Sequence, residues 1–292
     1  MPVTYTPLRY PGGKTAYADL LEKVIGLNHL SNVVLVEPFA GGAGASIKLL
    51  LENKVSRLLL SDLDPAIYAF WWSVLHSTDA LIERVAQTPL TLKEWRHQRE
   101  ISRRKDTQDL LSLGFSTLYM NRCNRSGILT ANPIGGIHQD GVYKMDARFN
   151  RLGLIRKIKC IAAKSSYIEI RNTSCENLLS GLKRRKDTSN LLVYLDPPYY
   201  QKGPLLYLNH YDKNDHEKLS DIILSCPFNW ILSYDCRAEI RHLYCGIPQY
   251  KSQLRYTIMG NVKACELIAT RLKVPNILTR IPRVKNYGTS SH

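Results

Sequence analysis

The residues with the clearest chemical potential are Asp196, Pro197, Pro198 and Tyr199, which directly follow the apolar run LLVYL at 191–195. A carboxylate at the end of a buried strand lies at the edge of an α/β sheet where ligands bind. Asp196 and the Pro197 carbonyl can each accept one hydrogen of a planar amine, which disfavours delocalisation of the nitrogen lone pair into the ring. Tyr199 offers a flat face for that ring. The pattern predicts a site that makes an aromatic amine nucleophilic, and the alternative is a strand exit stiffened by two prolines.

A second candidate site is the glycine-rich segment EPFAGGAG at 37–44, which follows the apolar run VVLV at 33–36. Its small residues let the backbone approach a nucleotide-like ligand, although a tight turn also needs glycines. Asp62 ends the next apolar run, where a carboxylate can accept hydrogen bonds from two ribose hydroxyls, and a helix N-cap is the alternative. Residues 12–15 (GGKT) resemble the end of a P-loop, but position 8 is Leu where that pattern needs Gly. We therefore expect no ATP or GTP cradle.

The elements that must position these residues follow an α/β order. Helical spacing predicts a helix at about 15–27 and another from about Ala45. Apolar runs predict strands at 33–36, 58–60, 167–170, 191–195, 229–234 and 266–272. After the first helix come a strand, a glycine turn, a helix and a second strand that ends in an acid, which is the order typical of the start of a nucleotide-binding domain.

The middle of the chain has a different character. Residues 76 to about 110 are predicted to be helical and polar, and from 118 Asn, Gly, Pro and Asp predict loops, with a hairpin turn at 140–141. Between residues 144 and 186, 12 Lys and Arg face 3 Asp and Glu, so nine of the chain's net 15 positive charges fall there. We expect the charge to be concentrated where the chain is least regular.

Composition limits the class of protein. With 292 residues, 44% hydrophobic and 22% charged, the chain is expected to be globular, with about two domains. The net charge of +15 favours a polyanion such as nucleic acid, and a membrane surface is the rival partner. No apolar run is long enough to span a membrane and no secretory segment is seen, so a cytoplasmic location is expected. The seven Cys are scattered without a C-x-x-C pair, and we expect no metal site.

The ordered set of motifs resembles one known family. These motifs are YPGGK at 10–14, EPFAGG at 37–42, Asp62, a long insert and DPPY at 196–199. The chain resembles the Dam-like amino-methyltransferases, and its motifs follow the order of their alpha group. That family methylates adenine N6 in DNA and uses S-adenosylmethionine, and the resemblance covers nearly the whole chain.

The resemblance implies a fold and a domain division. The expected fold is α/β, a Rossmann-like S-adenosylmethionine-dependent methyltransferase sheet that is mixed and seven-stranded. The catalytic domain would comprise 1–75 and 166–292. A mainly helical, loop-rich target-recognition domain would be inserted at 76–165.

The resemblance also implies residue roles. Adenine is expected to be handled by the catalytic residues Asp196, Pro197, Pro198 and Tyr199. The expected cofactor-binding residues are Tyr10, Gly12, Lys14, Glu37, Pro38, Phe39, Gly41, Gly42, Asp62 and Asp196. Asn121 and Arg122 match a pair that family members place at the DNA surface.

Further DNA contacts are expected around that pair and in the basic region. They are Asn124, Arg125, Lys144, Arg156, Lys157 and Lys159. We expect Arg156, Lys157 and Lys159 to contact phosphates and Arg125 to read a base edge. The segment CNRSG at 123–127 departs from the YGYNG pattern of GATC-reading enzymes, so GATC specificity is not expected.

These observations lead to one expected function and two rivals. We expect a site-specific DNA adenine N6-methyltransferase acting on an adenine flipped out of double-stranded DNA, as a monomer without metal, with a cognate restriction or defence-system protein as an optional partner. The first rival is a non-catalytic DNA-binding regulator that retains the fold. The second is an enzyme that methylates RNA adenine or cytosine N4, but Asp rather than Ser before the two prolines favours adenine.

Overall fold

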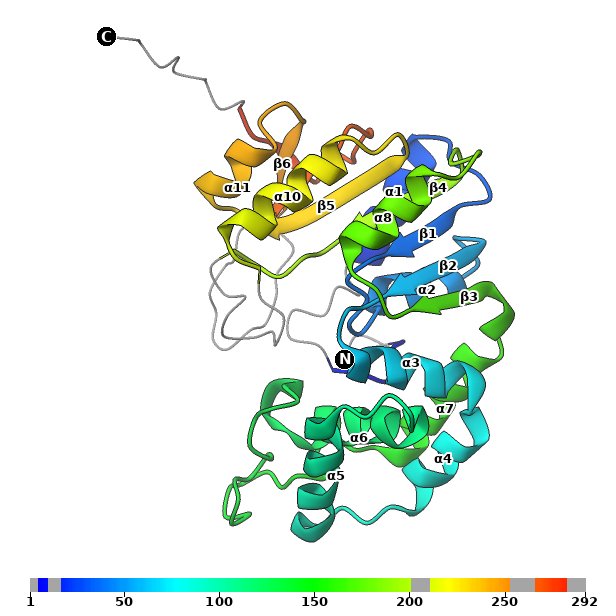
Figure 1. Cartoon of the computed structure of the whole chain (residues 1–292), viewed down its shortest axis with the longest axis vertical. Coiled ribbons are helices and arrows are strands. Elements are labelled where there is room, and N and C mark those ends of the chain that lie inside the picture. The colour runs from blue at the N-terminus through cyan, green and yellow to red at the C-terminus, as the bar shows by residue number, and fades with distance from the viewer. Residues whose placement is uncertain (1–4, 10–16, 201–210, 253–265, 283–292) are drawn as a thin grey trace.

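The computed structural model describes residues 5–9, 17–200, 211–252 and 266–282, which form one mixed sheet covered by helices (Figure 1). The strands are β1 Val34–Glu37, β2 Arg57–Ser61, β3 Ile168–Arg171, β4 Leu191–Leu195, β5 Asn229–Asp235, β6 Gln249–Ser252, β7 Glu266–Ala269 and β8 Thr279–Arg280. The α-helices are α1 Tyr17–Leu27, α2 Gly44–Leu51, α3 Pro65–His76, α4 Thr78–Gln87, α5 Leu92–Arg104, α6 Leu110–Cys123, α7 Arg151–Ala162, α8 Cys175–Lys183, α10 Lys213–Leu224 and α11 Ala238–Leu243.

The described residues form eight strands in the order β3-β2-β1-β4-β5-β7-β6-β8. The pairs from β3 through β5 are parallel, and β7, β6 and β8 add to the sheet antiparallel. The predicted mixed, Rossmann-like α/β sheet is confirmed, but the predicted count of seven strands is too low by one. The extra strand β8 is a pair of exposed residues at the edge of the sheet, next to β6, and two polar residues give no apolar run to detect.

All six strands expected from apolar runs are present. Their ends lie within one residue of the prediction, except that β7 stops at Ala269 instead of residue 272. The sequence pattern missed β6, whose residues QYKS near the sheet edge are mostly polar. Helices α1 and α2 also lie where they were expected.

The strand order brings two predicted site segments to the same edge of the sheet. β1 pairs with β2 on one side and with β4 on the other, so Leu35 lies between Leu58 and Leu192. The connections reverse direction between β1 and β4, and open α/β sheets bind ligands at the carboxyl ends of strands at such a point. The segments that follow β1 and β4 therefore leave the sheet side by side.

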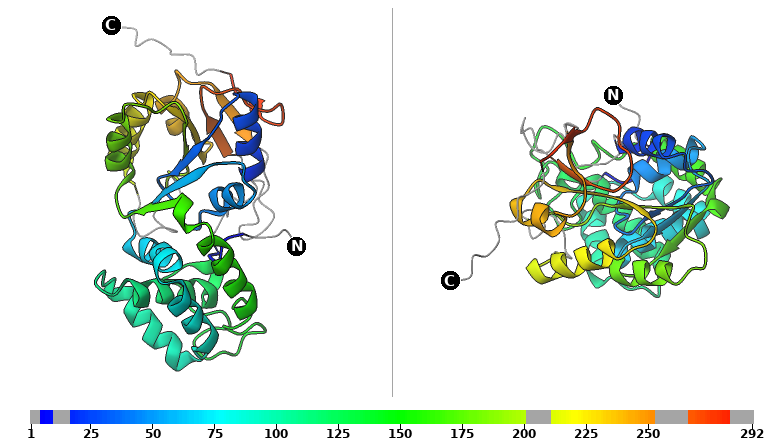
Figure 2. Two further views of the ribbon diagram at one scale, coloured as in Figure 1. Left: turned by 90° about the vertical axis from the view of Figure 1, so that its right-hand side faces the viewer. Right: turned by 90° about the horizontal axis from the view of Figure 1, so that it is seen from above.

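Both faces of the parallel strands are buried. α1 and α2 cover one face and α8 and α10 cover the other (Figure 2). Leu35 belongs to the core on the side of α1, whereas the next residue, Val36, belongs to the core on the side of α8. This double burial explains why these strands appear in the sequence as continuous apolar runs.

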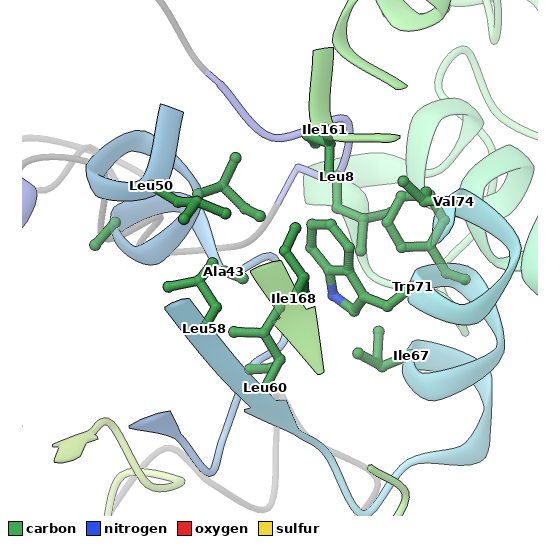
Figure 3. Close-up of a cluster of buried hydrophobic side chains, with 14 of the residues drawn as sticks. Leu8, Ala43, Leu50, Leu58, Leu60, Ile67, Trp71, Val74, Ile161 and Ile168 are labelled. Atoms are coloured by element: carbon green, nitrogen blue, oxygen red, sulfur yellow. The ribbon is translucent and has the colours of Figure 1, made fainter. Parts of the chain in front are cut away.

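Helices α4 to α7 lie together beyond one end of the sheet, in cyan to green in Figures 1 and 2. α3 contacts both this helical region and the sheet, through α6 and β3. Its Trp71 is fully buried in a cluster with Leu8, Ile161 and Ile168 (Figure 3). The domain boundary predicted at residues 75 and 76 thus falls at the end of a helix that joins the two regions, and the division itself stays a prediction.

Two expectations for the middle of the chain are wrong. The loop region expected from residue 118 begins only after α6 ends at Cys123, and residues 151–162 form α7, so much of the basic excess lies on a regular helix. Leu154, Ile158 and Ile161 are the buried residues of α7, at the spacing of an amphipathic helix, and the charged residues between them obscured that stripe. The turn at 140–141 is not part of a hairpin, because no strand flanks it within 124–150.

Candidate active site and nucleic-acid interface

The loop after β4 is held mainly by residues of the neighbouring strand β5. Ser233 Oγ donates a hydrogen bond of 2.8 Å to Asp196 Oδ1. The backbone N–H of Tyr200 donates to Asp235 Oδ1 at 3.1 Å, and Pro197 is buried between these two anchors. Since one carboxylate oxygen of Asp196 faces Ser233, the side chain has a fixed orientation at the carboxyl edge of the sheet.

Tyr199 is anchored from its hydroxyl end. Its hydroxyl donates to Glu266 Oε1, and the Tyr17 hydroxyl of α1 donates to Glu266 Oε2. Glu266 is only 2% exposed at the start of β7, and the Tyr17 ring stacks on Tyr194 of β4, with centroids 5.9 Å apart. Burial raises the pKa of Tyr199 far above its ordinary value, so the hydroxyl stays a donor. This network fixes the position of the Tyr199 hydroxyl, at the far end of the ring.

The glycine-rich loop after β1 is tied to the end of β2. Gly41, whose φ is 44°, donates its backbone N–H to Asp62 Oδ2 at 2.9 Å, and Asp64 N donates to Asp62 Oδ1 at 2.9 Å. Trp71 Nε1 of α3 donates to the Gly41 carbonyl at 2.9 Å. Asp64, not Asp62, caps α3, because its carboxylate accepts from Ala66 N. The alternative hypothesis, that Asp62 is a helix N-cap, is therefore wrong.

The electrostatics of Asp62 differ from those of a surface acid. Burial raises its pKa to about 6, although the hydrogen bonds from the Gly41 and Asp64 amides act in the opposite direction. Ionising such a carboxylate costs free energy unless further hydrogen-bond donors contact it. A ligand that supplies hydroxyl donors would favour its charged form.

The other cofactor-binding candidates lie in the same loop or outside the described residues. Glu37 is buried and accepts a hydrogen bond from Ser46 Oγ of α2. Phe39 packs edge-on against Tyr211, with centroids 6.0 Å apart, and Pro38 and Gly42 are buried. Tyr10, Gly12 and Lys14 lie outside the described residues.

Two of the predicted DNA-binding residues are buried. The Asn121 side chain donates to the carbonyls of Arg9 and Gly127 at 2.7 and 2.8 Å and accepts from Arg9 N at 2.7 Å. Asn124 is fully buried, donates to the carbonyls of Ile128 and Leu129, and accepts from Trp95 Nε1 at 2.7 Å. Both amides thus use their donors and carbonyls to shape the loop that follows α6.

The remaining DNA-binding candidates differ in exposure. Lys144, Arg156 and Lys159 are exposed, and so is Arg125 at the start of the loop after α6. Lys157 is half-buried and donates to the Thr6 carbonyl at 3.2 Å. Arg122 is also half-buried. The structure therefore places the exposed cations on a surface and turns Arg122 and Lys157 inward.

A groove along α5 adds basic residues that the sequence did not indicate as DNA contacts. Arg96, Arg99 and Arg103 line it together with Ile137. The Arg99 guanidinium lies 5.0 Å from the centroid of the buried Trp95 ring. The helical spacing of these arginines in a polar helix was the available signal, but it is equally typical of a solvated face.

The family of the chain is shown by comparison with known proteins. The model of the D12 class N6 adenine-specific DNA methyltransferases matches residues 10–258, and the chain belongs to that family. Its activity is therefore adenine-specific DNA methylation, and the predicted relationship is confirmed.

Other comparisons add little. The solved structure of the rRNA methyltransferase aviRa from Streptomyces viridochromogenes is similar, with 13% identity and a TM-score of 0.37 over 93% of this chain and 86% of that chain. No curated protein matches the chain. Within the described residues, no group of His, Cys, Asp and Glu could hold a metal ion, and no helix is long and apolar enough to cross a membrane.

Proposed function

We propose that the chain methylates N6 of an adenine flipped out of double-stranded DNA, at the edge where β1 and β4 end, with S-adenosylmethionine as the methyl donor. The observation that carries the proposal is the double anchoring of the DPPY loop, by Ser233 on Asp196 and by Glu266 on Tyr199. These contacts hold an acceptor and an aromatic ring at the sheet edge where the glycine-rich loop also ends, as an aromatic amine requires.

The residues after β1 and β2 fit the cofactor. Burial raises the pKa of Asp62 to about 6 in spite of two backbone donors, so the further donors that two ribose hydroxyls supply would favour its charged form. The positive φ of Gly41 and the burial of the small residues at 40–43 keep side chains away from the space above the loop. When bound, S-adenosylmethionine supplies an electrophilic methyl group on a sulfonium. We assign its binding to Asp62, Asp196 and the loop from Glu37 to Gly42, with Tyr10, Gly12 and Lys14 as further expected contacts.

The DPPY residues prepare the adenine. Asp196 and the Pro197 carbonyl accept the two N6 hydrogens, which keeps the lone pair out of conjugation with the ring, and Tyr199 stacks on the base. Because N6 is paired inside the duplex, the adenine has to leave the helix before these contacts form. Positioning and the charge of Asp196 supply the acceleration, and the methylated nitrogen sheds a proton readily, so no strong general base is needed.

We further propose that residues 76–165 form the target-recognition unit. Exposed cations of α5 and α7, including Arg96, Arg103, Arg156 and Lys159, would contact phosphates. Arg125 would read a base edge from the loop that Asn121 and Asn124 hold in place. In this assignment the two buried amides position the loop without contacting DNA.

The test is a methylation assay with purified protein, S-adenosylmethionine and genomic DNA, followed by digestion and mass spectrometry of the nucleosides. N6-methyladenine should form with the wild type and not with Asp196→Ala. N4-methylcytosine as the product, or methylation of RNA alone, would refute the proposal. DNA binding without any product would support the non-catalytic regulator instead.

A further inference from the structure

Four basic side chains that act on one another come from the segment 5–9, from α6, from the turn before α7 and from α7 itself. They are Arg9, Arg122, Arg148 and Lys157, here called the basic pocket. Arg122 Nε and Arg9 Nη1 are both buried without a hydrogen-bond partner. Within the described part of the chain, no ion pair involves either arginine.

The members of the basic pocket are close enough to repel one another. The pKa of Arg122 is lowered to about 10 by burial and by the charge of Arg9, and the pKa of Lys157 is lowered to about 8 by burial and by Arg122. Burial and the charge of Arg148 lower the pKa of Arg9 as well. Like charges brought together and partly removed from water cost free energy unless an anion compensates them.

The fold enforces this arrangement. Asn121 bonds to both the N–H and the carbonyl of Arg9, which fixes the backbone of that residue on the last turn of α6. A Cβ at Gly127 would lie 2.4 Å from the Arg9 carbonyl, and the φ of Gly127 is +76°, so only glycine permits this close approach. Leu8 is buried beside Trp71 and Ile161 (Figure 3). The segment is therefore held firmly, and the Arg9 backbone stays beside the last turn of α6, which carries Arg122.

We propose that the basic pocket binds one phosphate group of the DNA backbone, an inference that rests on the proposed function. A phosphate carries the negative charge that several converging cations need, and its oxygens accept from Arg and Lys together. A guanine edge is the other arginine ligand in DNA, but it is uncharged and offers only two acceptors. The convergence of four cations from four segments of the chain favours the phosphate.

The first test measures DNA affinity over a range of salt concentrations for Arg9→Gln, Arg122→Gln and the double variant. Loss of one phosphate contact lowers the slope of log K against log salt by about 0.9. Because both arginines serve the same phosphate, the double variant should lose no more than about 0.9. Independent contacts would give about 1.8 for the double variant and would overturn the proposal. Lys186→Gln, which removes an equal charge from an exposed loop, is the matched control.

Folding of the variants is checked by thermal melting. Removing an unpaired buried charge should leave the midpoint unchanged or higher. If Arg122→Gln weakens binding to one base sequence and not to others, the residue reads a base and the proposal is wrong.

The second test follows Lys157 directly by NMR in protein with isotope-labelled lysine. Its pKa of about 8 in the free protein should rise by at least one unit when a short duplex binds, because the phosphate favours the charged form. A duplex that binds without changing the Lys157 titration overturns the basic pocket but leaves the proposed function intact. If no duplex binds, the proposed function fails, and a titration with inorganic phosphate then decides whether the pocket takes an anion.

Discussion

The anchor of Tyr199 can be removed without touching the ring that is expected to stack on adenine. Tyr199→Phe deletes only the hydroxyl that donates to Glu266, and Glu266→Gln replaces the shared acceptor of Tyr199 and Tyr17 by an amide with one acceptor oxygen. A hydrogen bond to a charged group contributes about 1.5–3 kcal/mol. If that free energy serves to hold the ring in the transition state, its loss corresponds to about 10- to 150-fold in rate.

The assay compares steady-state kinetics of the wild type, the two single variants and the double variant. We expect kcat to fall by at least about tenfold in Tyr199→Phe, with little change in KM for S-adenosylmethionine. The double variant should be about as slow as the slower single variant, since both substitutions break one interaction. Lys251→Ala, at an exposed residue of the neighbouring strand β6, is the control for disturbance of the sheet. Full turnover in Tyr199→Phe, or additive losses in the double variant, would refute the role of the anchor.

Three further predictions follow from the site. Asp196→Ala should lower kcat by about 10²–10³-fold or more while the DNA dissociation constant changes little, and binding and turnover measured on the same preparation check this. The affinity for S-adenosylmethionine should fall about tenfold for each pH unit below 6, because hydroxyl donors bind the ionised form of Asp62, whose pKa is about 6. Calorimetry at a series of pH values checks this, and Asp62→Asn should bind the cofactor more weakly, with an affinity that does not change with pH. Arg125→Ala should relax discrimination at one base position, at a cost of about 1–3 kcal/mol there, whereas Arg156→Gln should weaken all sequences alike, as titration of single-base variants of the target would show.

The part of the fold that the sequence predicts well is the parallel half of the sheet. Strands buried on both faces leave continuous apolar runs, and the acids that end them, Asp62 and Asp196, mark the carboxyl edge. The pattern failed for α7, where Arg156, Lys157 and Lys159 hide the apolar stripe, and for the mostly polar strands β6 and β8 at one side of the sheet.

The residues that position the site were beyond sequence reasoning for a different reason. Tyr17, Tyr199 and Glu266 meet although 249 positions separate the first from the last, because the strand order places β7 beside β5. The only local signal is that Glu266 is an acid at the start of an apolar run, and this does not indicate which residues bond to it. Asn121 and Asn124 show the converse, since a polar pattern alone does not distinguish an amide that bonds to buried backbone from one on a DNA-facing surface.

The two halves of the candidate site depend on different parts of the molecule. The glycine-rich loop is fixed by Asp62 after β2 and by Trp71 of α3, whereas the DPPY loop is fixed by Ser233 and Glu266 of β5 and β7. The two loops leave the sheet side by side, where β1 and β4 end. Substitutions of Asp62 or Trp71 should therefore act mainly on cofactor binding, whereas substitutions of Ser233 or Glu266 should act mainly on turnover. α3, whose Trp71 bonds to the glycine-rich loop, also packs on α6, so one buried helix contacts both the proposed cofactor side and the proposed nucleic-acid side of the molecule.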